Sequence, residues 1–99
     1  MSDYYDKQGN PLTDDEYMAL LKREGWEYKR VAKTEVGEIT ISTVWLGLDH
    51  RYGDGPPVIF ETMQFGGDAD QDADRYCTLE EAQAGHAEWV RQVTAEATP

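Results

Sequence analysis

The sequence predicts one small α+β domain, in which a three-stranded antiparallel sheet (a meander) is flanked by an N-terminal and a C-terminal helix. Three observations support this prediction. Two capping-box motifs, each followed by a helical apolar pattern, indicate the starts of two helices. Between the motifs lie three runs rich in β-branched and aromatic residues, separated by glycine-containing turns. The length of 99 residues fits one domain, which we assign to residues 13–99.

The N-terminal part is expected to contain an irregular segment and then the first helix. Residues 1–12 look irregular because Gly9-Asn10-Pro11 breaks regular structure. Thr13-Asp14-Asp15-Glu16 matches a capping box, so a helix is expected to start there and to run to about Glu24. Gly25 is well placed to end this helix.

The next two runs, residues 26–34 and 38–49, predict a β-hairpin. We expect Thr34 to pair with Ile39, because this register places bulky apolar side chains on a common face. The same register pairs Ala32 with Ile41, Tyr28 with Trp45, and Trp26 with Gly47.

The C-terminal part is expected to add a strand, an acidic loop and a helix. The strand spans residues 58–65 and the loop residues 68–74. Thr78-Leu79-Glu80-Glu81 is a second capping box, and its helix is expected to run to about Thr94. His86 falls on the apolar stripe of that helix, which favours a core histidine over a metal ligand. Both sheet faces carry apolar residues, so either the helices divide between the faces or one face meets a second copy in a homodimer.

The charge limits the partners of this protein. Twenty acidic and nine basic residues give a net charge of −11. Such a field repels phosphate backbones and anionic lipids, so direct binding to nucleic acid or to a membrane surface is not expected. A protein with a basic surface is the expected partner. One version is a nucleic-acid-binding protein whose empty groove the acidic chain would fill as a nucleic-acid mimic.

Several chemistries have no support in the sequence. Cys77 is the only cysteine, so no internal disulfide forms and no Cys/His cluster suits zinc. No apolar run approaches the roughly 20 residues of a membrane span, and MSDYYDKQGNP lacks a signal-peptide layout. No motif for a cofactor or a phosphate loop is present. We therefore expect a cytoplasmic protein without a cofactor.

Four aspartates at alternate positions form the most unusual stretch: Asp68, Asp70, Asp72 and Asp74. Counted from Asp70, they partly match an EF-hand calcium loop. The sixth position of that loop needs glycine but holds Arg75, and no helix leads into it. We therefore predict no metal site and interpret the stretch as a solvated loop whose aspartates are candidate binding residues.

A second candidate site lies at a predicted strand end, where Asp49, His50 and Arg51 precede a Gly/Pro-rich loop. These residue types serve acid–base chemistry and bind anions. Glu61 lies in the following strand and needs a cationic partner if its face is buried. The alternative function is therefore an enzyme or ligand-binding domain centred on these four residues. No catalytic residue is assigned, because no nucleophile motif accompanies them.

The run STVWLGLDHRYGDGPPVIFETMQFGG, residues 42–67, resembles a widespread family of small bacteriophage-encoded proteins. The flanking stretches YKRVAKTEVG and RYCTLEEAQAGHAEWV extend the resemblance to about residues 26–93. It implies a phage or prophage origin and expression in the host cytoplasm, but it implies no activity. Our leading hypothesis is a non-enzymatic accessory protein that binds a host or phage macromolecule, and we expect that macromolecule to be a protein.

Overall fold

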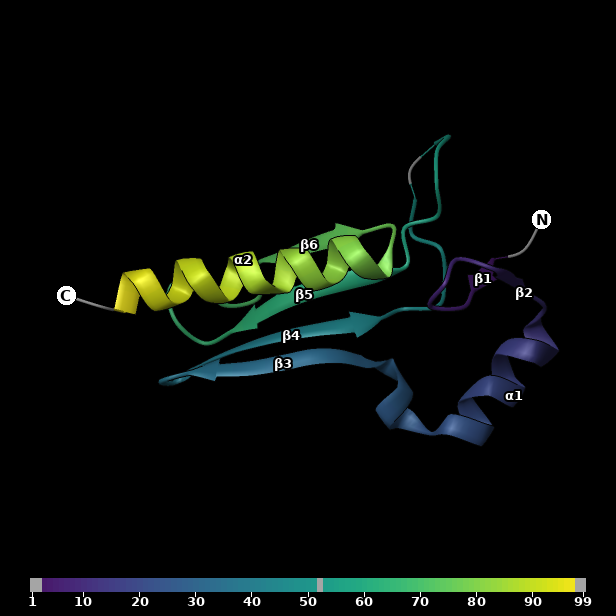
Figure 1. Ribbon diagram of the computed structural model, residues 1–99, viewed down its shortest axis with the longest axis horizontal. Helices are drawn as coiled ribbons and strands as arrows, with labels where there is room; N and C mark the ends of the chain where they lie inside the picture. Colours follow the sequence, from purple (N-terminus) through teal and green to yellow (C-terminus); the bar gives the residue numbers. More distant parts are fainter. Residues whose placement is uncertain (1–2, 52, 98–99) are drawn as a thin grey trace.

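The computed structural model describes residues 3–51 and 53–97 of the chain. Residues 1–2 of the segment expected to be irregular, and residues 52 and 98–99 of the assigned domain, lie outside the described residues. The described residues form an α+β domain with a four-stranded sheet, a two-stranded sheet, two α-helices and a 3₁₀ helix (Figure 1). The elements in chain order are β1 (Tyr4–Tyr5), β2 (Pro11–Leu12), α1 (Asp14–Glu24), η1 (Trp26–Lys29), β3 (Arg30–Val36), β4 (Ile39–Trp45), β5 (Phe60–Phe65), β6 (Ala73–Tyr76) and α2 (Leu79–Ala97).

The main sheet is an antiparallel meander of four strands in the order β3-β4-β5-β6, so the prediction of three strands was wrong. The additional strand, β6, begins inside the predicted acidic loop. Its residues pair with β5 from Phe60–Tyr76 to Met63–Ala73. The side chains from Ala73 to Arg75 are exposed at the sheet edge. The backbone hydrogen bonds that hold this strand leave no apolar pattern in the sequence.

The β3–β4 hairpin has a shorter turn than predicted. Val36 pairs with Ile39, and Thr34 pairs with Ile41, so the predicted register was wrong by two residues. A shift of two residues preserves the period-two alternation, so residues 32–36 and 39–43 stay on their predicted faces. A β-bulge between Arg30 and Ala32 interrupts this alternation at the start of β3. The segment expected to begin the first strand instead forms η1, which leaves Trp26 exposed and away from the sheet.

α2 covers one face of the main sheet and contacts all four strands (Figure 1). Its capping box is confirmed: the Glu81 amide donates to Thr78 Oγ1 at 3.0 Å, and Glu81 Oε1 accepts from the Thr78 amide at 3.2 Å. The largest fully buried side chains are apolar or threonine: Trp45, Phe60, Ile41, Ile59, Thr43 and Thr62. The buried hydrophobic cluster joins side chains of the sheet and of the loop before β5 to Ala82 of α2 and to three residues of the N-terminal part: Tyr5, Tyr17 and Leu20.

α1 does not cover the second sheet face, so the helices do not divide between the faces. It packs on β1, β2 and η1 beyond the end of β4 (Figure 1). The predicted capping box at the start of α1 is confirmed. Tyr17 stacks on Tyr4, with ring centroids 4.1 Å apart, and reaches Trp45 at 5.7 Å. Within the described chain, no helix packs on the other sheet face. Strand alternation assigns to that face Lys33, Glu35, Thr40, Ser42, Val44, Glu61, Met63, Phe65, Ala73 and Arg75.

Candidate functional site

Asp49 organises the loop between β4 and β5. Its Oδ1 accepts hydrogen bonds from the amides of Arg51 at 2.8 Å and Val58 at 2.9 Å. Its Oδ2 lies 2.7 Å from Nε of Arg51, whose guanidinium also donates to the Gly55 carbonyl. Burial alone would raise the pKa of Asp49, but these two amides and the Arg51 charge outweigh burial and lower the pKa. Asp49 and Arg51 are therefore engaged in closing the loop.

Glu61 lies in β5 and forms an ion pair with a residue outside the loop. Its Oε2 is 3.0 Å from Nε of Arg75, the residue that faces it across the β5–β6 pair. The His50 amide donates to the Val58 carbonyl and helps close the loop. The four residues of the alternative site are thus held by two separate sets of bonds that do not converge on a common centre.

The four aspartates form and flank the β5–β6 turn. Asp70 Oδ1 accepts from the Gly66 amide at 2.7 Å, and the Asp72 amide donates to the Ala69 carbonyl. Gln71 has a φ of 71°, the left-handed conformation that the turn requires. One aspartate therefore shapes the turn. The side chains of Asp68, Asp72 and Asp74 are exposed.

Two of these aspartates line a groove that also involves the far end of α2. The groove has a volume of about 600 Å³ and lies beside the β5–β6 turn. Carboxylates come from Asp68, Asp72 and Glu96, and apolar surface comes from Ile39 and Val93. Sequence reasoning missed this groove, because only the direction of α2 across the sheet brings Glu96 to the turn. We call it the acidic groove.

His86 is buried between α2 and the sheet, as predicted for a core histidine. Its Nε2 lies 2.9 Å from Thr34 Oγ1, and its Nδ1 lies 2.7 Å from Thr43 Oγ1. Thr43 in turn hydrogen-bonds to Thr62 across β4 and β5. Burial lowers the pKa of His86. Both ring nitrogens are occupied within the core, so the imidazole is not presented to a ligand.

Other reactive groups are also unsuited to catalysis. Burial raises the pKa of the Cys77 thiol, and the charges of Glu81 and Asp49 raise it further, which disfavours the nucleophilic thiolate. In residues 3–51 and 53–97, no three His, Cys, Asp or Glu side chains are grouped closely enough to hold a metal ion. Neither helix in the described parts is long and apolar enough to cross a membrane.

Comparisons of the chain with protein-family models, with curated proteins and with solved structures find no match. The candidate binding surfaces of this protein are therefore argued from the geometry and charge of its own residues.

Proposed function

We propose that this protein is a small, non-enzymatic accessory protein of a bacteriophage that binds a basic surface of a host or phage protein in the host cytoplasm. The acidic groove is the observation that carries the proposal. It combines three carboxylates with an apolar floor, a composition suited to lysine and arginine side chains. Such side chains bring both a charge and an aliphatic stem to an interface.

The charge of the whole chain supports a basic partner. A net charge of −11 raises the rate of encounter with a positively charged protein and repels acidic competitors. The groove would then fix the position of a basic side chain after the encounter. The bacteriophage assignment rests on the resemblance of residues 26–93 to small phage proteins, which also supplies the cytoplasmic setting.

The alternative, an enzyme or ligand site at Asp49, His50, Arg51 and Glu61, has less support. Asp49 and Arg51 bond to each other and to the loop backbone, while Glu61 pairs with Arg75. A general acid or base must be free to reach the proton that it transfers, whereas Asp49, Arg51 and Glu61 are already bonded within the protein.

Binding partners captured from host lysate by the wild-type protein and by a groove variant test the proposal. The variant carries Asp68→Asn, Asp72→Asn and Glu96→Gln, which remove the three groove carboxylates. We expect a captured basic protein to bind the variant at least about tenfold more weakly, mainly through slower association at low salt.

The control removes the same charge elsewhere through Asp15→Asn, Glu27→Gln and Asp54→Asn. This variant should lose much less affinity, because it alters only the long-range field. If both variants lost the same affinity, the total charge of the protein, and not the acidic groove, would account for binding. If His50→Ala abolished binding and the groove variant did not, the alternative site would be favoured.

A further inference from the structure

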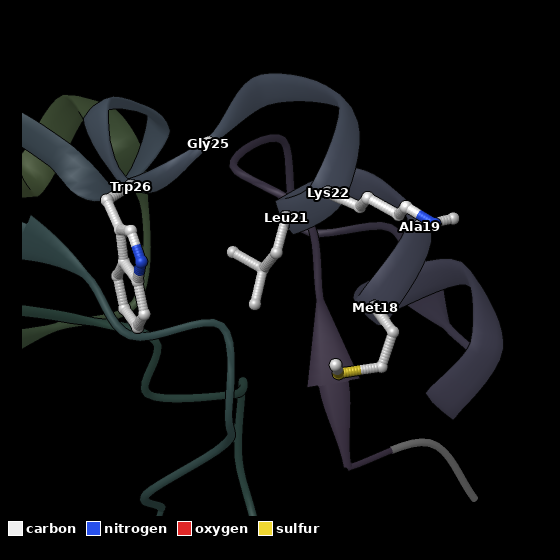
Figure 2. Close-up of a pocket in the computed structure, with 6 residues that line it drawn as sticks. All are labelled: Met18, Ala19, Leu21, Lys22, Gly25 and Trp26. Carbon is white, nitrogen blue, oxygen red and sulfur yellow. The ribbon is translucent and has the colours of Figure 1, made fainter.

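A second surface, at the opposite end of the sheet from the acidic groove, is apolar. A cleft of about 430 Å³ lies between α1 and η1, lined by Met18, Ala19, Leu21, Lys22, Gly25 and Trp26. Figure 2 shows Met18 and Leu21 on one side of the space and the indole of Trp26 on the other. Trp26 is 78% exposed and Met18 is 62% exposed, so two large apolar side chains face solvent at one cleft. We call it the α1–η1 cleft.

Gly25 creates the cleft. It ends α1 with a φ of 77°, a conformation that favours glycine, and its amide donates to the Leu21 carbonyl at 2.7 Å. The chain then bends into η1, so Trp26 lines the cleft across from Leu21 and Met18 of α1 (Figure 2). Nζ of Lys29 lies 4.7 Å from the Trp26 ring centroid, which places a cation beside the indole.

The stretch of chain that forms this cleft is basic, although the chain as a whole is acidic. Residues 22–33 contain five basic residues and two acidic ones, a local charge of +3 in a chain of −11. Two of the basic residues lie at the cleft: Lys22 lines it, and Lys29 lies beside Trp26. Arg23 and Arg30 pair with the two acidic residues, Glu24 and Glu27. Opposite charges on the two partners favour encounter and fix register, so this rim selects an acidic partner.

The form of the cleft favours a side chain of a protein over a free small molecule. Small-molecule sites usually enclose most of their ligand, whereas this cleft has walls only from α1 and the segment that follows it (Figure 2). A protein segment can insert one large apolar side chain and cover the rim with its flanking residues. Tryptophan is enriched among the residues that contribute most of the binding energy at protein interfaces.

A second copy of this chain is a poorer occupant. Two copies that met through this cleft would bring Lys22 and Lys29 of one copy close to those of the other, and each copy carries −11 overall. Both terms oppose association. A foreign acidic segment meets a complementary rim instead.

We infer that the α1–η1 cleft is a docking site for an acidic protein segment that inserts one large apolar side chain beside Trp26. The site is separate from the acidic groove, and it gives the protein two binding surfaces of opposite charge. This inference therefore does not depend on the function proposed above.

The test selects peptides from a random 12-residue display library on the full-length protein at low salt. We expect one enriched class in which a large apolar residue is flanked by aspartate or glutamate. The affinity of synthetic peptides from this class should fall at least about tenfold in the Trp26→Ala variant. It should also fall in the double variant that carries Lys22→Gln and Lys29→Gln. Phe65→Ala is the matched control, because Phe65 is also a large exposed residue (45%) but lies on the uncovered sheet face. It should leave affinity unchanged.

Other outcomes would overturn the inference. One is the absence of an acidic class; another is an acidic class that binds Trp26→Ala as well as wild type. A third is concentration-dependent burial of Trp26 without peptide, which would make a second copy the occupant. A basic class that requires Asp68, Asp72 and Glu96 would support the acidic groove alone, so the two proposals can fail separately.

Discussion

His86 occupies a buried position that favours the neutral imidazole. It is buried between Thr34 and Thr43, whose hydroxyls lie within hydrogen-bond distance of its two ring nitrogens. A neutral imidazole donates through one nitrogen and accepts through the other, and a hydroxyl can fill either complementary role. Burial disfavours the charged form and lowers the pKa of His86. This residue therefore links protonation to folding.

We expect the free energy of unfolding to fall as the pH drops below about 6.5, the ordinary histidine pKa. Below that value the unfolded chain gains a proton at this residue that the folded protein binds less readily, and above it the contribution is fully present. Urea unfolding between about pH 7.5 and about pH 5 measures the slope. His86→Gln should flatten it. An unchanged slope in His86→Gln would contradict this account.

Trp45 is the largest fully buried side chain. The predicted cross-strand pairing of Tyr28 with Trp45 was wrong, because Tyr28 lies in η1. The two rings are nevertheless in contact, with centroids 5.0 Å apart at an interplanar angle of 90°, and the Trp45 indole N–H donates to the Tyr5 carbonyl at 3.0 Å. We expect Trp45→Ala to cost about 3–5 kcal/mol of unfolding free energy, measured in urea, because it leaves a cavity in the core. Trp26→Ala should cost no more than about 0.5 kcal/mol, since Trp26 is exposed. Equal costs would place Trp45 outside the stabilising core.

At the level of elements, the approach of α2 to the sheet depends on Gly85. A glycine in the middle of a helix is unfavourable by itself. Here a Cβ on Gly85 would overlap the ring of Tyr76, the last residue of β6. The missing side chain therefore lets α2 lie close against β6, and packing outweighs helix propensity.

Gly85→Ala should accordingly destabilise the protein, although alanine favours an isolated helix by about 0.8–1 kcal/mol. In a Tyr76→Ala background the overlap is removed, so the same substitution should stabilise by up to about 1 kcal/mol. A double-mutant cycle of unfolding free energies measures both effects. If Gly85→Ala stabilised both backgrounds equally, close packing against Tyr76 would not be the reason for the glycine.

The same elements explain which parts of the fold could be predicted from sequence. Both helix starts were predicted, because a capping box is a local pattern that determines local hydrogen bonds. The hairpin register was not, because a shift of two residues preserves the pattern of faces. β6 was missed because an exposed edge strand needs only backbone pairing, which side-chain composition does not report.

Over the whole molecule, the candidate surfaces were harder to predict than the core. The acidic character of residues 68–74 is visible in the sequence, but its meeting with Glu96 depends on the path of α2. Trp26 was expected to pack in the sheet, and its exposure results from the bend at Gly25. The strand-end residues were read as a site from their chemistry, although the loop uses two of them for its own closure.

The position of α2 after all four strands of the main sheet also has a consequence for synthesis. During translation the strands leave the ribosome first, and the face that α2 covers has no partner until residues 79–97 follow. Domains tend to fold as units, and exposed strand surfaces promote aggregation of incomplete chains. The acidic residues that alternate through the β5–β6 turn are already present at that stage. Their mutual repulsion would help keep neighbouring nascent chains apart until the helix completes the fold.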